Sequence, residues 1–179
     1  DMFVRLDMED HRVTQSTIDI VLKMHDIGLK NVGVVLQARL FRTIDDIKSI
    51  CSVLQGDADI RICKGIYLEP SDIAHTEYRA INKGYSEALS MMFENNSYCA
   101  IATHDKPVVA DALLQLKEKQ MGVGISDPRD GARQTGDDKG PGYEFQMLLG
   151  VRGDMRRKLL KQGHKVRVYV PFGEKWYEY

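Results

Sequence analysis

The sequence predicts an α/β fold of six strand–helix units around a parallel sheet, which is either a doubly wound open sheet or part of a TIM-like (β/α)8 barrel. Two observations carry this prediction. Short apolar, β-rich runs alternate with segments whose apolar residues recur every three to four positions, which is the pattern of strands joined by helices. Each strand-like run also ends in polar residues that a buried strand does not need for packing. In a parallel barrel these ends share one face, where active sites are built.

The first two units are short and regular. Residues 3–8 form a β-rich run, and residues 14–27 have helical spacing of apolar residues up to Gly28, which can end a helix in the left-handed conformation. A buried strand is expected over residues 33–38 and a helix over residues 43–54.

The second helix begins with a capping signal, and the third unit is longer. Thr43 is expected to cap its helix, with Asp46 at the capping-box position. Residues 60–65 predict the third strand. Residues 71–93 predict the helix that follows, with a break near Gly84.

The last three units follow the same pattern. Pro107 opens the fourth helix, where its missing amide hydrogen costs nothing. The strands are expected over residues 98–103, 143–148 and 165–170, and the helices over residues 107–120 and 154–162.

This alternation fits either a doubly wound open sheet or a barrel. No G-x-G-x-x-G follows the first strand, which weakens a dinucleotide-binding open sheet. Six units do not close an eight-stranded barrel, so residues 1–179 are expected to be a partial barrel core, strands 3 to 8, with the others outside the given sequence. Residues 122–142 hold six glycines, two prolines and seven charged residues, and are expected to be a flexible insertion.

Composition excludes several classes of protein. The chain has 25 basic and 26 acidic residues, and this balance gives no support to nucleic-acid binding. No apolar run approaches the ~20 residues that cross a bilayer, and residues 1–5 resemble no targeting signal. Cys51, Cys63 and Cys99 are odd in number and far apart, which favours a reducing compartment such as the cytoplasm.

Three charged or polar residues, within a strand or at a strand end, point to ligand chemistry. Arg61 lies inside its strand, so it must face a carboxylate, with Asp7 as a candidate, or a bound electron-rich group. Lys64 followed by Gly65 suits a phosphate-bearing cofactor, and Lys64 is also a candidate Schiff-base amine. No second or third potential metal ligand lies at a suitable spacing from His104, so no metal is expected.

At these residues the sequence resembles the proline dehydrogenase family, FAD-dependent enzymes on a (β/α)8 barrel, and most of all its bacterial monofunctional branch. The matching stretches occur in family order and span nearly the whole chain. They are residues 5–10, 35–38, 61–70, 102–105, 144–152 and 167–173, with 176–179.

The resemblance implies oxidation of L-proline to Δ1-pyrroline-5-carboxylate, by hydride transfer to the flavin N5 of FAD, with a quinone as electron acceptor. It places Asp7 and Arg61 in the catalytic site. The cofactor contacts that it implies are Met8, Gln37, Arg61, Lys64, Gly65, Ile66, Thr103 and His104. The substrate contacts that it implies are Tyr67, Leu148, Tyr169 and Tyr179. With a quinone as electron acceptor, the resemblance also implies peripheral contact with the inner membrane.

The chain departs from the family pattern at several places. Ile66 stands where a small alanine is usual, and its extra carbons would narrow the site beside the flavin. An aromatic residue is common where Arg39 and Leu149 stand. The family's paired arginines that grip the substrate carboxylate would follow Tyr179, where the given sequence stops. Tyr169 favours proline over hydroxyproline.

Two other functions stay open at this point. One is a lyase that uses Lys64 as a Schiff-base amine. The other is a barrel that binds a metabolite without turnover, with Ile66 closing the flavin pocket. Composition and pattern leave the oligomeric state undetermined.

Overall fold

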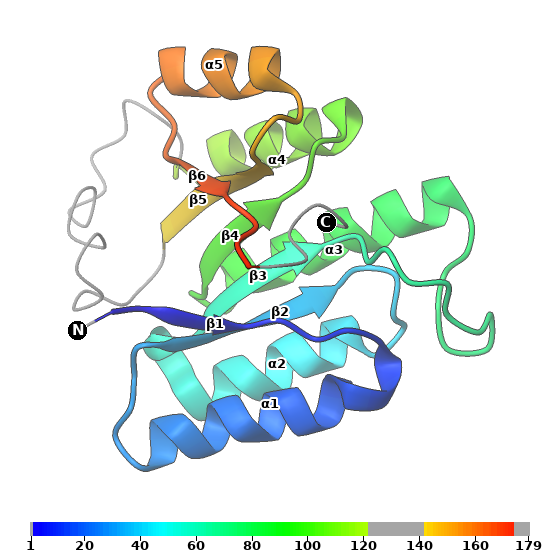
Figure 1. The fold of residues 1–179 in the computed structure, drawn as a ribbon, viewed down its shortest axis with the longest axis vertical. Coiled ribbons are helices and arrows are strands. Elements are labelled where there is room, and N and C mark those ends of the chain that lie inside the picture. Colours follow the sequence, from blue (N-terminus) through cyan, green and yellow to red (C-terminus); the bar gives the residue numbers. More distant parts are fainter. Residues whose placement is uncertain (1, 122–141, 174–179) are drawn as a thin grey trace.

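The computed structural model describes residues 2–121 and 142–173, which form six β-strands and five α-helices (Figure 1). The strands are β1 (Val4–Leu6), β2 (Val32–Gln37), β3 (Asp59–Cys63), β4 (Tyr98–Ala102), β5 (Gly142–Leu148) and β6 (Val166–Tyr169). The helices are α1 (His11–Asp26), α2 (Thr43–Leu54), α3 (Tyr78–Glu94), α4 (Lys106–Glu118) and α5 (Gly153–Lys161), with a short 3-10 helix η1 (Gln55–Asp57) after α2.

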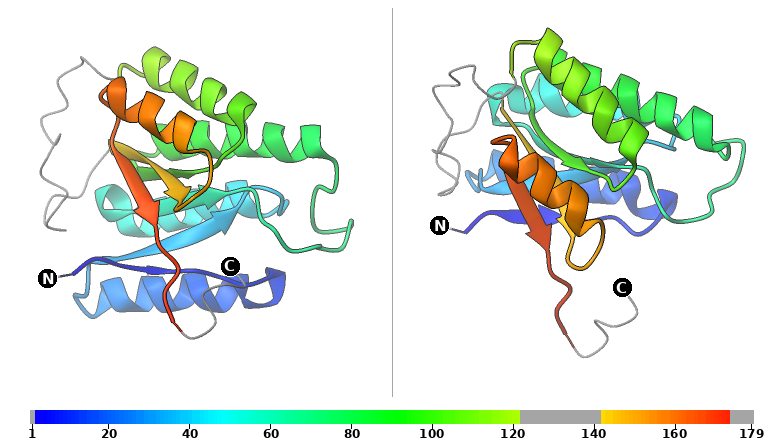
Figure 2. Two further views of the ribbon diagram at one scale, coloured as in Figure 1. Left: turned by 45° about the horizontal axis from the view of Figure 1, so that its top comes forward. Right: turned by 90° about the horizontal axis from the view of Figure 1, so that it is seen from above.

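The strand order decides between the two architectures. All six strands are parallel and lie in chain order, β1-β2-β3-β4-β5-β6. A doubly wound sheet reverses its order at a switch point, and this sheet does not. Consecutive helices from α1 to α4 pack against one another around the outside of the curled sheet (Figure 2). The result is a half-barrel, which confirms the predicted barrel-type fold.

The two faces of the sheet differ in chemistry, because successive side chains of a strand point to opposite faces. The outer face packs against the helices and is apolar. Its buried members include Val34, Leu36, Ile60, Ile62, Ile101 and Phe145. The alternate positions face the inside of the curl and are largely polar. They include Arg5, Asp59, Arg61, Glu144, Gln146 and Arg167.

The expected helix over residues 71–93 is wrong at its start. Helix α3 begins only at Tyr78, and the segment before it folds back onto the β2–α2 connection. There the amide of Phe41 donates to the carbonyl of Ile73 (2.9 Å), and the amide of His75 donates to the carbonyl of Arg39 (2.8 Å). These contacts satisfy backbone groups that a helix would otherwise have paired.

The expected break at Gly84 is also wrong. Helix α3 runs through Gly84 without interruption. A Cβ atom at this position would lie 2.7 Å from the carbonyl oxygen of Ala38, so glycine here lets the helix pack closely against the end of β2.

Helix α2 has the expected bounds, but Thr43 does not cap it. The N-cap residue is Arg42, and it makes no side-chain cap bond. The hydroxyl of Thr43 instead donates to the carbonyl of Gln37 (2.5 Å), which ties the helix to the end of β2. Asp46 pairs with Arg42 (2.8 Å) instead of capping the helix.

Two expectations fall outside the described residues. The insertion over residues 122–142 lies there except for Gly142, which begins β5. Tyr179 also lies there. None of the helices in the described ranges is both long and apolar enough to cross a membrane.

Candidate active site

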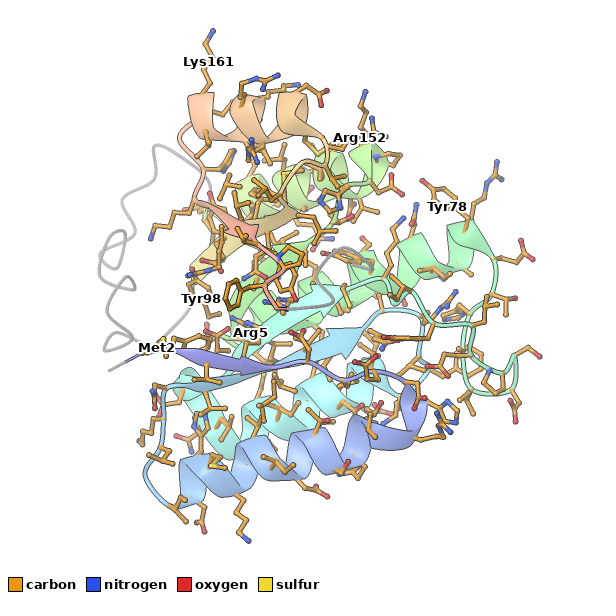
Figure 3. The ribbon with its side chains drawn as sticks, viewed as in Figure 1. Met2, Arg5, Tyr78, Tyr98, Arg152 and Lys161 are labelled. Atoms are coloured by element: carbon orange, nitrogen blue, oxygen red, sulfur yellow. The ribbon has the colours of Figure 1, made fainter. Side chains whose placement is uncertain are left out.

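Most of the predicted site residues that the structure describes lie at one rim of the half-barrel, the edge formed by the carboxyl ends of the strands. Because the strands are parallel, their carboxyl ends lie at the same edge, as in a barrel enzyme. Figure 3 shows Tyr78, at this rim, at the opposite end of the sheet from Arg5 and Tyr98. The rim holds Asp7 after β1, Gln37 at the end of β2, Lys64 after β3, Thr103 and His104 after β4, Leu148 at the end of β5 and Tyr169 at the end of β6.

Arg61 joins three strands across the inner face. Its Nη1 donates to Asp7 Oδ1 (2.7 Å) beyond β1, and its Nε donates to Gln146 Oε1 (2.6 Å) on β5. The Arg61 side chain is 15% exposed and that of Asp7 is 54% exposed. The predicted Asp7 partner is therefore present, and the guanidinium is held rigidly toward the inside of the curl.

A second polar layer on the inner face supports Arg61. Glu144 accepts two bonds from Arg167 (2.6 and 2.9 Å), and Gln146 Nε2 donates to Glu144 Oε1 (2.5 Å). Burial alone would raise the pKa of Glu144, but the bonds and charge of Arg167 outweigh it and lower the pKa. An ionised Glu144 accepts the Gln146 amide hydrogen and so turns the Gln146 oxygen toward Arg61.

Sequence reasoning missed Glu144 and Arg167 as members of this network. The available signal was the alternation of polar and apolar residues within residues 143–148, which marks one face of that strand as polar. A third ion pair of the inner face, Arg5 with Asp59 (2.6 Å), lies toward the amino ends of the strands, with both side chains almost fully buried.

Lys64 is held by a carboxylate and an aromatic ring. Its Nζ pairs with Asp105 and lies 4.5 Å from the centre of the Tyr78 ring, while the Tyr78 hydroxyl donates to Asp105 (2.6 Å). Burial would raise the pKa of Asp105, but the bonds from Lys64 and Tyr78 lower it. Because Lys64 Nζ is engaged by the Asp105 carboxylate and the Tyr78 ring, this arrangement does not favour a role as Schiff-base amine.

His104 is poised to donate a hydrogen bond at the rim. Its Nε2 accepts the amide hydrogen of Leu148 (2.9 Å), and burial, with a smaller effect of Arg152, lowers its pKa. A neutral ring that accepts at Nε2 carries its hydrogen on Nδ1. Within residues 2–121 and 142–173 no three His, Cys, Asp or Glu side chains cluster as metal ligands would.

Gln37 and Gly65 form a cradle at the ends of β2 and β3. Gln37 Nε2 donates to the carbonyl of Glu9 (3.2 Å), but its buried Oε1 has no donor among the described residues. Gly65 has φ +91°, and a Cβ there would lie 2.6 Å from Gln37 Oε1 and 2.9 Å from Arg39 Cδ. Only glycine fits, and the unmatched acceptor suits a flat ligand that presents an N–H group.

The other predicted contact residues differ in exposure and in the direction of their side chains. The hydroxyl of Tyr67 donates to the Glu9 carboxylate. Ile66 is 83% exposed, so its side chain does not fill the cradle. Met8 is buried on the outer, helix-facing side, where its sulfur accepts the Thr14 hydroxyl (3.2 Å), so only its main chain faces the rim. Thr103 is buried and accepts the Asp105 amide (3.1 Å).

The predicted substrate contacts are partly described. Leu148 and Tyr169 are direct partners in the β5–β6 register, so their side chains lie side by side on the inner face. Leu148 is half-buried and Tyr169 is 40% exposed. Tyr179, the fourth predicted member, is not among the described residues.

Comparison with known proteins decides the family. The sequence profile named Proline dehydrogenase matches residues 1–176. The chain belongs to the proline dehydrogenase family. It is 32% identical to proline dehydrogenase of Deinococcus radiodurans over 182 aligned positions, which cover 99% of this chain and 51% of that protein. It is 35% identical to proline dehydrogenase 2 of Bacillus subtilis over 178 positions, covering 99% and 52%.

Solved structures of proline utilization A (PutA) share the fold. The Bdellovibrio bacteriovorus protein, inactivated by N-propargylglycine, superimposes with a TM-score of 0.78 at 23% identity, over 96% of this chain and 18% of that one. A mutant of the Bradyrhizobium japonicum protein gives 0.73 at 19% identity, over 94% and 18%. The chain spans about half the length of the curated proline dehydrogenases it matches.

Proposed function

We propose that this chain is part of the catalytic barrel of an FAD-dependent proline dehydrogenase that oxidises L-proline to Δ1-pyrroline-5-carboxylate. The observation that carries the proposal is the convergence of Arg61, Gln37, Gly65 and Lys64 on one rim of a half-barrel whose sequence matches this family. A hydride leaves the ring carbon beside nitrogen and a proton leaves the nitrogen, which creates the C=N bond of the product.

The residues present fit a flavin. The chemistry supplied by FAD is acceptance of the hydride at N5 and transfer of two electrons to a quinone. Gln37 Oε1 offers an acceptor for an N–H group, and Gly65 allows close approach of a flat ring. Arg61 holds a fixed positive charge on the inner face, which stabilises the negative charge that reduction brings. Lys64, the main chains of Met8 and Ile66, Thr103 and His104 would line the rest of the cofactor.

The substrate groups are small in number and mostly apolar. Leu148 and Tyr169 form a wall for the proline ring, with Tyr67 close to the Glu9 carboxylate and Tyr179 completing the set. Asp7 would keep Arg61 oriented beside the reacting atoms. Cys51, Cys63 and Cys99 form no disulfide, which supports a reducing compartment. A quinone acceptor would place the protein in peripheral contact with the inner membrane.

The test is an anaerobic titration of the full-length protein. We expect a yellow protein whose flavin absorption is bleached by L-proline, and we expect prior treatment with N-propargylglycine to abolish that bleaching. A colourless protein that fails to take up added FAD would contradict the proposal. Binding of proline without bleaching would favour a metabolite-binding barrel, and a borohydride-trapped adduct on Lys64 would favour a lyase.

A further inference from the structure

Arg39 is a buried cation to which no carboxylate among the described residues is paired. It follows β2, is 8% exposed, and its Nη1 donates to the main-chain carbonyl of Tyr67. Its Nε is buried and has no acceptor among the described residues. Because a buried charge is costly unless it is compensated, an unpaired guanidinium is a feature that needs an explanation.

Two other basic side chains of the rim, which are less exposed than Arg152, are paired with carboxylates within the described structure. Arg61 is paired with Asp7 and Lys64 with Asp105, while buried Glu69 is bonded to the His11 ring (2.5 Å). The carboxylate of Glu9 accepts the Tyr67 hydroxyl, and Glu9 is exposed, so water screens its charge. Among the described rim cations that are shielded from water, Arg39 is therefore the one without a carboxylate partner.

Arg39 also lies at the cradle. A Cβ at Gly65 would lie 2.9 Å from Arg39 Cδ and 3.1 Å from Arg39 Cγ, so its side chain passes directly beneath the Gly65 backbone, beside Gln37. A charge that is shielded from water acts strongly on a neighbouring group. Any ligand seated on Gly65 would experience this field.

We infer that Arg39 is an electrostatic residue of the cofactor site, whose uncompensated positive charge favours the negative charge gained on reduction and so raises the reduction potential of the bound flavin. The inference rests on the proposed function. It predicts that a neutral residue at position 39 makes the flavin harder to reduce while the fold and the cofactor are kept.

The experiment compares Arg39→Gln and Arg39→Lys in the full-length protein loaded with FAD, using anaerobic potentiometric titration. We expect Arg39→Gln to shift the midpoint potential to more negative values and to weaken sulfite binding to the oxidised flavin, with a Kd about tenfold higher. Arg39→Lys keeps the charge and should stay near the wild type in both measurements. Arg42→Gln, which removes a half-exposed arginine on the outside of the fold, is the matched control and should change neither.

The potentials of the two Arg39 variants distinguish an electrostatic role from a structural one. An unchanged potential in Arg39→Gln overturns the inference, and equal shifts in the Gln and Lys variants would mean that Arg39 acts only by holding the Tyr67 carbonyl. If Arg39→Gln does not fold, Arg39→Lys still tests the inference, because a shifted potential in a charged variant contradicts it. If wild-type protein takes up FAD but proline never bleaches it, the proposed function fails while the potential measurement stands.

Discussion

Arg61 shows how a single side chain can organise this rim. It reaches from β3 to Asp7, just after β1, and to Gln146 on β5, so a carboxylate and an amide hold it at once. The position inside a strand was readable from the sequence, and so was Asp7 as a partner. Gln146 as the second partner was not, because its orientation depends on Glu144 below it.

Arg61→Met tests this arrangement directly. Methionine keeps much of the length but removes the fixed cation, so we expect flavin reduction by proline to slow by about 100-fold and the flavin potential to fall. Stopped-flow absorbance on the full-length protein measures the rate of flavin reduction, and redox titration measures the flavin potential. Arg12→Met, at an exposed arginine that pairs with Asp10, is the control. Unchanged kinetics in Arg61→Met would show that this side chain lies away from the reaction.

Ile66→Ala tests whether the bulk at this position narrows the cofactor site. The side chain is 83% exposed and does not enter the cradle between Gln37 and Gly65. We therefore expect the Kd for FAD to change by less than about threefold, which corresponds to under about 0.7 kcal/mol. Fluorescence titration of the apoprotein measures it. A tenfold gain in affinity would mean that the isoleucine obstructs the ring.

At the scale of elements, local sequence patterns placed nearly all strands and helices. The strands were readable because those buried on both sides are nearly continuous apolar runs, and the helices because their buried faces repeat every three to four residues. The start of α3 and the role of Thr43 were not readable. Both depend on contacts with the end of β2, which are distant in sequence and carry no local signature.

The same limit applies to the site. Parallel strands guarantee that their polar ends meet, so the set of rim residues followed from the order of elements alone. The ion-pair or hydrogen-bond partner of each rim side chain could not be predicted from the order of elements. Asp105 with Lys64, and Arg39 with the Tyr67 carbonyl, are set by how neighbouring loops fold over the rim.

Gly84→Ala tests the close packing of α3 against β2. Alanine favours a helix, but its Cβ would lie 2.7 Å from the Ala38 carbonyl oxygen, so a shift of helix or strand is required. We expect the free energy of unfolding to fall by about 1–3 kcal/mol, measured by urea denaturation. Gly56→Ala is the control, since a Cβ there meets nothing within 4 Å. Equal stability of the two variants would argue against the close approach.

Glu144→Gln tests the ion pair between β5 and β6 through its pH dependence. The folded-state pKa of Glu144 is lowered, so its contribution to stability is fully present above the unfolded-state pKa and is lost as pH falls through the folded value. We expect the variant to be about 1–3 kcal/mol less stable at pH 7. This difference should shrink as the pH is lowered below about 4. A difference that stays constant from pH 7 to pH 3 would contradict the assignment.

At the scale of the whole molecule, the half-barrel separates two kinds of surface. The outer face of the sheet is sealed by helices and is apolar, while the inner face carries paired charges in layers that end at the rim. A net charge of -1 gives no hint of this separation, because the inner cations and carboxylates cancel in the total. Packing on the outer face therefore stabilises the fold, while the inner face carries the polar residues of the candidate site.

A structure of the full-length protein with FAD bound is the most direct measurement of this account. The account predicts that the flavin ring lies on the inner face of the sheet, with an N–H group on Gln37 Oε1, the ring over Gly65 and the Arg61 guanidinium on the same side. A flavin bound on the helix-covered face, or at the amino ends of the strands near Arg5 and Asp59, would contradict it.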